Sequence, residues 1–379
     1  MNKVVITKPV FDEQEINKLQ KCLDSGWVTQ GPFVKEFEQK FSERHAVKYA
    51  LATTSCTAAL HMSILALGVG AGDEVIVPAF TWVTSAHCVE YAGAKVVFCD
   101  VDPTTFNIDP QKLEEEITSK TKAIVAVHLF GLSAPMDEIL SMAKKHNLKV
   151  IEDAACATGS TYNGKPVGGF GDFGCFSFHP RKVITTGEGG MVTTNDQVLA
   201  SEVQILRNHG ATGPSSVIPR EKPYHMGTFN ALGFNLRMSD IQAAVGVAQM
   251  AKLDSLLEKR RQLADSYTDK LVDINGIVTP YIPEGCEHSF QSYVLRVLGT
   301  NAHNKRNAIM DRMAEQGIQT RPGTHAVHRL GYYADKYGIE SGHFPNASLC
   351  EDTTITLPVF HDMTEHEQDA VVNIIREML

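Results

Sequence analysis

The sequence contains no long basic run, no C-x-x-C pair and no apolar stretch long enough to cross a bilayer. Its 35 lysines and arginines are outnumbered by 44 aspartates and glutamates, which gives a net charge of −9. This balance argues against a nucleic-acid partner. The most apolar helix-like run, residues 58–67, is too short for a transmembrane helix. We therefore expect neither a nucleic acid nor a membrane as a partner.

The sequence also lacks the cysteine spacing of a disulfide framework, although it contains eight cysteines. Most of them lie in apolar stretches, which predicts reduced, buried thiols. The N-terminal segment has no apolar core of the kind that signal peptides carry, so we expect a cytoplasmic protein. His325 and His328 have no evident third or fourth ligand in the sequence, and no metal is expected.

What the sequence does contain is an alternation of short apolar runs with helix-length segments. Valine and isoleucine are frequent in the apolar runs, which is typical of strands buried on both faces of a sheet. The alternation predicts an α/β fold with a mostly parallel central sheet. The expected strands are 74–78, 95–101, 123–129, 148–152, 173–178 and 190–194, and the expected helices between them are 84–91, 110–118 and 135–146.

A long helical pattern begins near Met238 and continues towards Leu271. Helices of this length often connect two lobes, so we place a domain boundary near residue 250. The prediction is a large domain over 1–250 and a smaller α+β domain over 251–379. In the smaller domain we expect a strand at 289–297 and helices at 303–316 and 365–378.

The first segment with chemical potential starts at Ser55. Ser55, Cys56 and Thr57 precede a run of strong helix formers. The amides at such a helix start, together with the helix dipole, bind anions. Taken alone, these residues are better explained by a plain serine N-cap without any ligand.

The second segment is an acid that follows a strand. Asp153 lies at the carboxyl end of the strand expected at 148–152. In open α/β sheets this end faces the crevice where ligands bind. A carboxylate there is able to hold a proton on a ligand nitrogen, or it caps the next turn of the chain.

The third segment, residues 176–190, joins a strand ending to a lysine and a glycine-rich turn. Ser177 ends the strand and Lys182 follows five residues later. A lysine that condenses with a carbonyl must lose its proton, which burial and a cationic neighbour such as His179 or Arg181 favour. The alternative is a solvated basic pair, which the surrounding apolar and glycine residues make less suitable.

A glycine-rich pattern, G-x-G-x-x-G, occurs at residues 169–174. A dinucleotide-binding fingerprint must follow a strand and begin a helix. Here the pattern follows a loop and begins an expected strand. We therefore exclude a dinucleotide site.

These segments together resemble the DegT/DnrJ/EryC1/StrS family of aminotransferases, which act on sugars with pyridoxal 5′-phosphate (PLP). The resemblance implies an aspartate-aminotransferase-type fold (PLP fold type I), with a large domain and a smaller C-terminal domain. It covers nearly the whole chain. The matching motifs are GWVTQGP (26–32), SCTAALH (55–61), GDEVIVPAFTWVTSA (72–86), IEDAA (151–155), FSFHPRKVITTGEGG (176–190), RNHG (207–210), GFNLRMSDIQAA (233–244) and HSFQSYVLRV (288–297).

The resemblance also implies roles for single residues. Lys182 would hold PLP as a Schiff base, and Asp153 would pair with the ring nitrogen. Related dehydratases have histidine at the lysine position, so Lys182 favours transamination. The other cofactor contacts implied are Cys56, Thr57 and Ser177 at the phosphate, Trp82 over the ring face unless it is a core aromatic, Cys156 at the ring hydroxyl, and Asn235 reaching across a homodimer interface.

Two cysteines depart from the family pattern. Many relatives have glutamine or histidine at the position of Cys156, and a thiol is a weaker hydrogen-bonding group. Many have glycine at the position of Cys56, so a side chain there narrows the phosphate loop. Neither change removes the lysine or the acid.

By the same resemblance the amino donor would be L-glutamate and the acceptor a keto sugar, nucleotide-linked and deoxygenated, in a ping-pong reaction. The residues implied at the substrate are Thr29, Gln30, Arg321, His325 and His328, for which a surface-loop role is an equal alternative. Three other functions stay open. They are amination of a free cyclitol ketone, a PLP lyase or desulfurase with a cysteine nucleophile, and a binding protein that retains the fold without catalysis.

Overall fold

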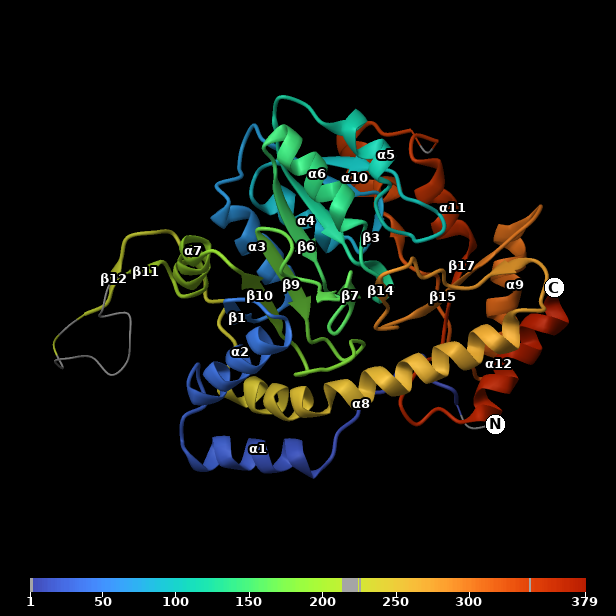
Figure 1. Cartoon of the computed structure of the whole chain (residues 1–379), viewed down its shortest axis with the longest axis horizontal. Coiled ribbons are helices and arrows are strands. Elements are labelled where there is room, and N and C mark those ends of the chain that lie inside the picture. The colour runs from blue at the N-terminus through green and yellow to red at the C-terminus, as the bar shows by residue number, and fades with distance from the viewer. Residues whose placement is uncertain (1–2, 213–223, 225, 341) are drawn as a thin grey trace.

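A seven-stranded sheet forms the centre of the molecule (Figure 1). The computed structural model describes residues 3–212, 224, 226–340 and 342–379. The strand order is β1-β10-β9-β6-β5-β2-β4, and only β10 runs against its neighbours. This confirms the expected mostly parallel sheet. Its strands are β1 (Tyr49–Thr53), β2 (Glu74–Pro78), β4 (Lys95–Cys99), β5 (Thr121–Val127), β6 (Lys149–Asp153), β9 (Phe173–Ser177) and β10 (Gly190–Thr194).

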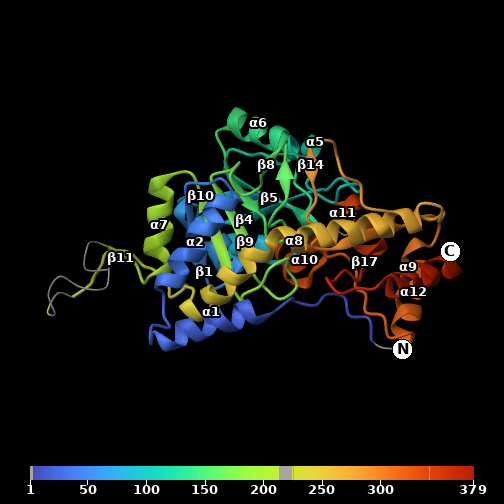
Figure 2. The same cartoon turned by 60° about the horizontal axis from the view of Figure 1, so that its bottom comes forward.

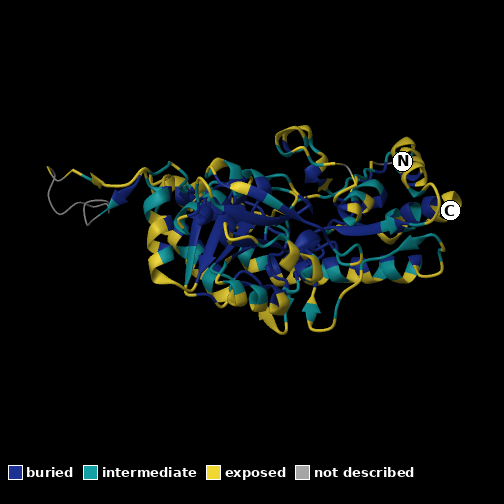
Figure 3. Cartoon of the chain, turned by 90° about the horizontal axis from the view of Figure 1, so that it is seen from above, coloured by how far each residue is buried: buried dark blue, intermediate teal, exposed yellow. Residues whose placement is uncertain are grey.

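Helices cover both faces of this sheet, so its strands are buried (Figure 3). Successive residues of a strand pack into different apolar cores. In β2, for example, Val75 and Val77 pack into the core on one face and Ile76 into the core on the other. One face is covered by α3 (Cys56–Ala66), α4 (Thr84–Tyr91) and α7 (Gln197–Arg207), and the other by α2 (Pro32–Arg44), α6 (Met136–His146) and the first half of α8 (Asp240–Leu271).

Helix α8 connects the two parts of the chain (Figure 1). A capping box at Ser239 begins the helix, and its first half packs on α2 and on α1 (Glu13–Asp24) (Figure 2). Its last turns belong to a separate apolar core, with residues 263–271 facing a three-stranded sheet. That sheet contains β13 (Ile277–Val278), β15 (Tyr293–Val297) and β17 (Thr354–Leu357), and is packed by α9 (Ala302–Glu315) and α12 (Glu365–Met378).

The C-terminal region also packs into the large core. Tyr333 of α10 (Gly331–Tyr337) and Cys350 of α11 (Pro345–Thr353) belong to the same apolar cluster as α3 and α4. The expected boundary near residue 250 falls inside α8 and stays a prediction. The remaining short elements are β3 (Phe80–Thr81), α5 (Pro110–Leu113), β7 (Thr161–Tyr162), β8 (Lys165–Pro166), β11 (Ala211–Thr212), β12 (Thr228–Phe229), β14 (Cys286–Glu287) and β16 (His325–Ala326).

Two expected elements differ from the structure. The strand predicted at 289–297 begins only at Tyr293, because Phe290 has a left-handed backbone (φ 45°). The helix predicted at 110–118 ends at Leu113 and continues as a 3₁₀ turn over Glu114–Glu116. The other expected helices and strands lie within a few residues of their predicted bounds.

A two-stranded antiparallel sheet, β11–β12, projects from the body beside α7 (Figure 1). Met226, Phe229 and Leu232 in and after it are exposed, at 76%, 60% and 89%. All eight cysteines are free, and six of them are buried. Within the described part of the chain, none of the helices combines the length and apolar character needed to span a membrane.

Candidate active site

A cavity of about 450 Å³ lies at the carboxyl ends of the parallel strands. Val127, Asp153 and Ser177, the last residues of β5, β6 and β9, all line it. Its volume falls within the range of about 300–1,000 Å³ that small-molecule sites occupy. Arg321 and Thr324 close it from the C-terminal part of the chain. The topology of the sheet therefore brings the expected strand-end residues to one place.

Lys182 reaches this cavity from the turn that follows β9. Its Nζ donates to the Sγ of Cys156 at 3.2 Å, and its backbone amide donates to the His179 carbonyl at 2.8 Å. The turn is tied back to the end of the strand, because the amide of Thr186 donates to the carbonyl of Phe178 at 3.0 Å. The amine therefore has a defined position at the wall of the cavity.

Asp153 is buried, and its carboxylate is held from several sides. The Ser85 hydroxyl donates to Oδ2 at 2.7 Å, and the amide of Ala155 donates to Oδ1 at 3.2 Å. The Cys56 thiol also donates to Oδ1, at 4.0 Å. Burial, followed by the negative charge of Asp153, raises the pKa of Cys56 well above its usual value. Cys56 is therefore a neutral thiol beside a fixed carboxylate.

The N-terminus of α3 closes another side of the cavity. Ser55 caps the helix by accepting from the amide of Ala58 at 3.1 Å, and Cys56 and Thr57 line the cavity. A Cβ at Gly190 would lie 2.6 Å from the Cys56 nitrogen, so only glycine lets β10 approach this helix start. The first turn of α3 and the nearby Ser177 hydroxyl form a cradle suited to a phosphate.

Basic side chains surround the cavity. His179, Arg181, Lys182 and Arg321 all line it, together with the acids Asp153 and Glu188. Burial lowers the pKa of Arg321, and the nearby charge of Arg181 lowers it further. Burial also lowers the pKa of His179. This side of the cavity is suited to an anionic ligand.

Several residues expected at the substrate do not line this cavity. Thr29 is exposed, and its carbonyl accepts from the amide of Asp240 at 3.2 Å. The carbonyl of Gln30 accepts from the Trp27 indole at 3.1 Å. Asn235, which was expected at the cofactor of a neighbouring subunit, is also exposed and forms a β-bridge with Asn208. These three residues lie outside the cavity that a single chain forms.

The two histidines of the loop after Arg321 have different environments. The ring of His325 lies 5.7 Å from that of Trp82, which lines the cavity. Its Nδ1 is 3.5 Å from a carboxylate oxygen of Glu351. His328, in contrast, is 1% exposed and packs on the Phe344 ring at 4.9 Å. The structure therefore does not bring His328 to the cavity, because its 3₁₀ turn directs the side chain into the core.

Sequence reasoning missed several residues at the site. Ser85, which fixes Asp153, belongs to a quoted motif, but its hydroxyl has no distinguishing signal. Gln291 lines the cavity, and its Nε2 donates to the carbonyl of Arg181 at 2.8 Å. Phe130 lines it as well. Gln291 and Phe130 lie in loops, where the pattern of apolar residues carries no positional information.

Backbone amides of the glycine-rich pattern at residues 169–174 bind a neighbouring acid, Glu152. The side chain of Glu152 is fully buried and accepts from the amides of Gly168, Phe170 and Gly171 at 2.7–2.8 Å. His128 lies 3.0 Å from the same carboxylate through Nε2, while its Nδ1 accepts from a backbone amide. Nε2 is therefore the donor to Glu152. Glu152 points away from the cavity and braces the strand that presents Asp153.

A family model for the DegT/DnrJ/EryC1/StrS aminotransferases matches residues 9–376. The chain belongs to this aminotransferase family. It is 39% identical over 379 residues to the GDP-perosamine synthase of Caulobacter vibrioides, covering 100% of this chain and 98% of the relative. It is 36% identical over 372 residues to the Bacillus subtilis spore coat polysaccharide biosynthesis protein SpsC, covering 98% and 96%.

Solved structures of the family agree with the fold. The PLP form of Spr1654 from Streptococcus pneumoniae superposes with a TM-score of 0.91 at 31% identity, covering 99% of this chain and 98% of that one. The chain is therefore a PLP-dependent aminotransferase of the expected fold type, as the sequence predicted. The residues of the cavity suit that cofactor. They offer an amine, a buried carboxylate and a helix N-terminus, which β10 approaches closely because residue 190 is glycine.

Proposed function

We propose that this aminotransferase moves an amino group from L-glutamate to a keto sugar carried on a nucleotide, in two half-reactions at one cavity. The observation that carries the proposal is the cavity itself, which is lined by Lys182 and Asp153. His179, Arg181 and Arg321 also line it, and we call these three residues the basic rim. The naming of a relative as GDP-perosamine synthase supports a sugar acceptor linked to a nucleotide. One cavity that would serve donor and acceptor in turn supports a ping-pong order.

Lys182 is the proposed catalytic amine. PLP, when bound, supplies an electron-withdrawing ring that stabilises negative charge at the substrate carbon. The Lys182 amine would hold the cofactor, and as a free amine it would move protons at the reacting carbon. The contact between its Nζ and Cys156 at 3.2 Å supports a fixed resting position.

Asp153 is proposed to hold a proton on the cofactor ring nitrogen. The carboxylate is suited to this role because the hydroxyl of Ser85 and the amide of Ala155 orient it. Cys56, Thr57 and Ser177 are proposed to bind the phosphate, and Trp82 to cover the ring. Cys156 would lie at the ring hydroxyl. All of these residues line the cavity, which supports the set as a whole.

The basic rim is proposed to bind the substrates. Arg321 presents a planar guanidinium that suits a carboxylate of glutamate or a diphosphate. His325 would act at the edge of the cavity, beside Trp82. An acceptor without phosphate, such as a free cyclitol ketone, would leave this rim without an anionic partner in the second half-reaction. The rim therefore favours the nucleotide-linked acceptor.

A second subunit is proposed to complete the site. Asn235 is exposed and lies beyond the cavity of its own chain, which supports a role at a partner's cofactor phosphate. Thr29 and Gln30 would likewise reach the substrate of a neighbouring chain. The exposed two-stranded sheet β11–β12 precedes Asn235 and offers apolar side chains for such a contact. We propose a homodimer with shared active sites, acting in the cytoplasm.

A cysteine-nucleophile chemistry finds little support. Burial raises the pKa of Cys350 to about 12, and its side chain is fully buried. Such a thiol is a poor nucleophile, because only the thiolate attacks. A binding protein without catalysis would have no use for the lysine and carboxylate at one cavity.

The test is an incubation of the PLP-loaded enzyme with L-glutamate and a panel of keto sugars, half linked to a nucleotide and half free. Mass spectrometry should detect an amino sugar only in the nucleotide-linked half, with one 2-oxoglutarate formed per product. The Lys182→Ala variant serves as a blank. If only free cyclitol ketones were aminated, the acceptor would be a free ketone and not a nucleotide-linked sugar. If no ketone were aminated, the proposal would be overturned.

A further inference from the structure

We propose that Phe130 sets the width of the substrate cavity on its C-terminal side, and that Gly323 is glycine because it leaves room for the Phe130 ring. Neither residue belongs to the set implied by the family resemblance. The inference rests on the proposed use of the cavity by PLP and its substrates. It does not depend on which acceptor is used.

Phe130 has an unusual backbone for a bulky residue. It follows β5 and has a φ of 59°, in the left-handed region that costs a non-glycine residue free energy. Phe130 lines the main cavity, although only 4% of the residue is exposed. The ring also packs at 5.7 Å from that of Phe106 and 6.2 Å from that of Phe80. Strained residues that persist at a cavity often serve its function.

Buried hydrogen bonds hold this strained turn in place. Asn107 is 1% exposed, and its Nδ2 donates to the carbonyls of Leu132 and Ser133 at 3.2 and 3.0 Å. Its Oδ1 accepts from the amide of Leu129 at 3.0 Å. The carbonyl of Phe130 itself accepts from the amide of Ser292 at 3.2 Å. The surrounding chain therefore fixes the direction of the aromatic ring.

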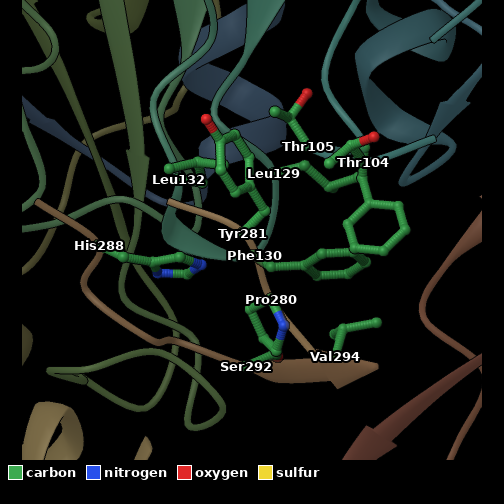
Figure 4. Close-up of a pocket in the computed structure, with 11 residues that line it drawn as sticks. Thr104, Thr105, Leu129, Phe130, Leu132, Pro280, Tyr281, His288, Ser292 and Val294 are labelled. Atoms are coloured by element: carbon green, nitrogen blue, oxygen red, sulfur yellow. The ribbon is translucent and has the colours of Figure 1, made fainter. Parts of the chain in front are cut away.

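Phe130 belongs to the lining of two hollows. One is the main cavity, and the other is a small pocket of about 10 Å³ (Figure 4). The small pocket is lined by side chains that include Leu132, Pro280 and His288, and Figure 4 shows the Phe130 ring among them. Because Phe130 lines both hollows, we expect removal of its ring to enlarge the main cavity towards the small pocket. The size of the ring therefore limits what the main cavity accepts.

Gly323 lies at the tip of this ring. A Cβ built at Gly323 would lie 3.0 Å from Cζ of Phe130 and 2.8 Å from Oγ1 of Thr354. The backbone is anchored, because the Gly323 amide donates to the same Thr354 oxygen at 3.1 Å. Arg321 and Thr324, on either side of it, line the main cavity. A side chain at 323 must therefore displace the ring or move the Arg321 loop.

The geometry predicts opposite effects at the two positions. Phe130→Ala should widen the cavity, whereas Gly323→Ala should narrow it. In the double variant Phe130→Leu with Gly323→Ala, the smaller side chain should accommodate the added methyl group. Phe106→Leu is a matched control, since Phe106 is also buried and left-handed (φ 65°) and lines only the small pocket.

The probe is a series of amino acids of increasing size, namely alanine, glutamate and phenylalanine, reacted with the PLP-loaded enzyme without any acceptor. The change in visible absorbance of the bound cofactor gives a rate for each amine. We expect Phe130→Ala to raise the phenylalanine-to-alanine rate ratio about tenfold, the scale on which a pocket discriminates by size. Gly323→Ala should lower the ratio, and the double variant should return it towards wild type.

Circular dichroism and equilibrium dialysis of PLP should first show that each variant is folded and loaded, and Phe130→Leu replaces Phe130→Ala if the latter is not. An unchanged ratio in the loaded Phe130 variant would overturn the inference. An equal change in Phe106→Leu would do the same, because the effect would then come from packing. A failure to find a keto-sugar product affects only the proposed function, since this experiment needs no acceptor.

Discussion

The cofactor side of the cavity and its substrate side differ in how completely one chain assembles them. Every cofactor residue predicted within the chain's own site lines the cavity, whereas among the predicted substrate residues Arg321 alone does so. The cofactor residues follow strand ends, begin a helix or lie in short turns of one sheet. The substrate residues lie on loops of separate elements. The topology of the sheet thus brings the first set together in one chain, whereas it does not bring the second set together.

The largest expected effect is at the centre of the cofactor side. Lys182→Ala should lower turnover by about 10³-fold or more, because nucleophile and proton carrier are lost together. The visible absorbance of the lysine-bound cofactor should disappear in both Lys182→Ala and Lys182→Arg. Spectra and steady-state assays measure both effects. Retention of the absorbance and activity in either variant would place the anchoring amine elsewhere.

The next effect separates two adjacent acids on the same strand. Glu152→Gln places an amide donor against backbone amides and His128, so it should lower the free energy of unfolding by about 3 kcal/mol. Asp153→Asn should leave stability nearly unchanged but lower turnover by about 100-fold, on the scale of a lost electrostatic partner. Urea denaturation and kinetics measure the pair.

The exposed Glu188 provides a control for the stability measurement, as Glu188→Gln. If Glu152→Gln unfolded at the same urea concentration as the wild type, the backbone amides that donate to residue 152 would not contribute to the free energy of unfolding. If Asp153→Asn kept full turnover, the carboxylate at the strand end would not be the group that acts on the ring nitrogen.

The contrast between the two sides also marks what the sequence alone could predict. Apolar runs predicted the sheet and five of its neighbouring parallel strands, because buried strands need valine and isoleucine on both faces. The position of Asp153 followed from the rule for strand ends. Ser85 and Phe130 could not be found this way, because a helix hydroxyl and a left-handed phenylalanine have no signature in a sequence. His328 was expected at the substrate from the family resemblance, which does not reveal on which side of a turn its ring lies.

Arg321 gives a smaller effect and tests the substrate side. Arg321→Lys keeps the charge but loses the planar fork, so the KM for a substrate anion should rise about tenfold with a smaller change in kcat. Steady-state kinetics with donor and acceptor varied in turn will show which one the guanidinium binds. Gln319→Asn, in the same loop but outside the cavity lining, serves as the control. Equal loss of kcat and kcat/KM would instead give Arg321 a role in the chemistry.

The smallest expected effect separates the two histidines of one loop. His325 is half-exposed and lies near Glu351, so His325→Gln should raise the acceptor KM only about two- to threefold, as weak exposed contacts do. His328→Gln should leave KM unchanged and lower the free energy of unfolding by about 1–2 kcal/mol, because a buried ring that packs on Phe344 is lost. Thermal unfolding and acceptor titrations distinguish the two. A change in KM for His328→Gln together with unchanged stability would mean that the loop changes conformation during catalysis. His328, which is buried in the structure, would then contact the substrate.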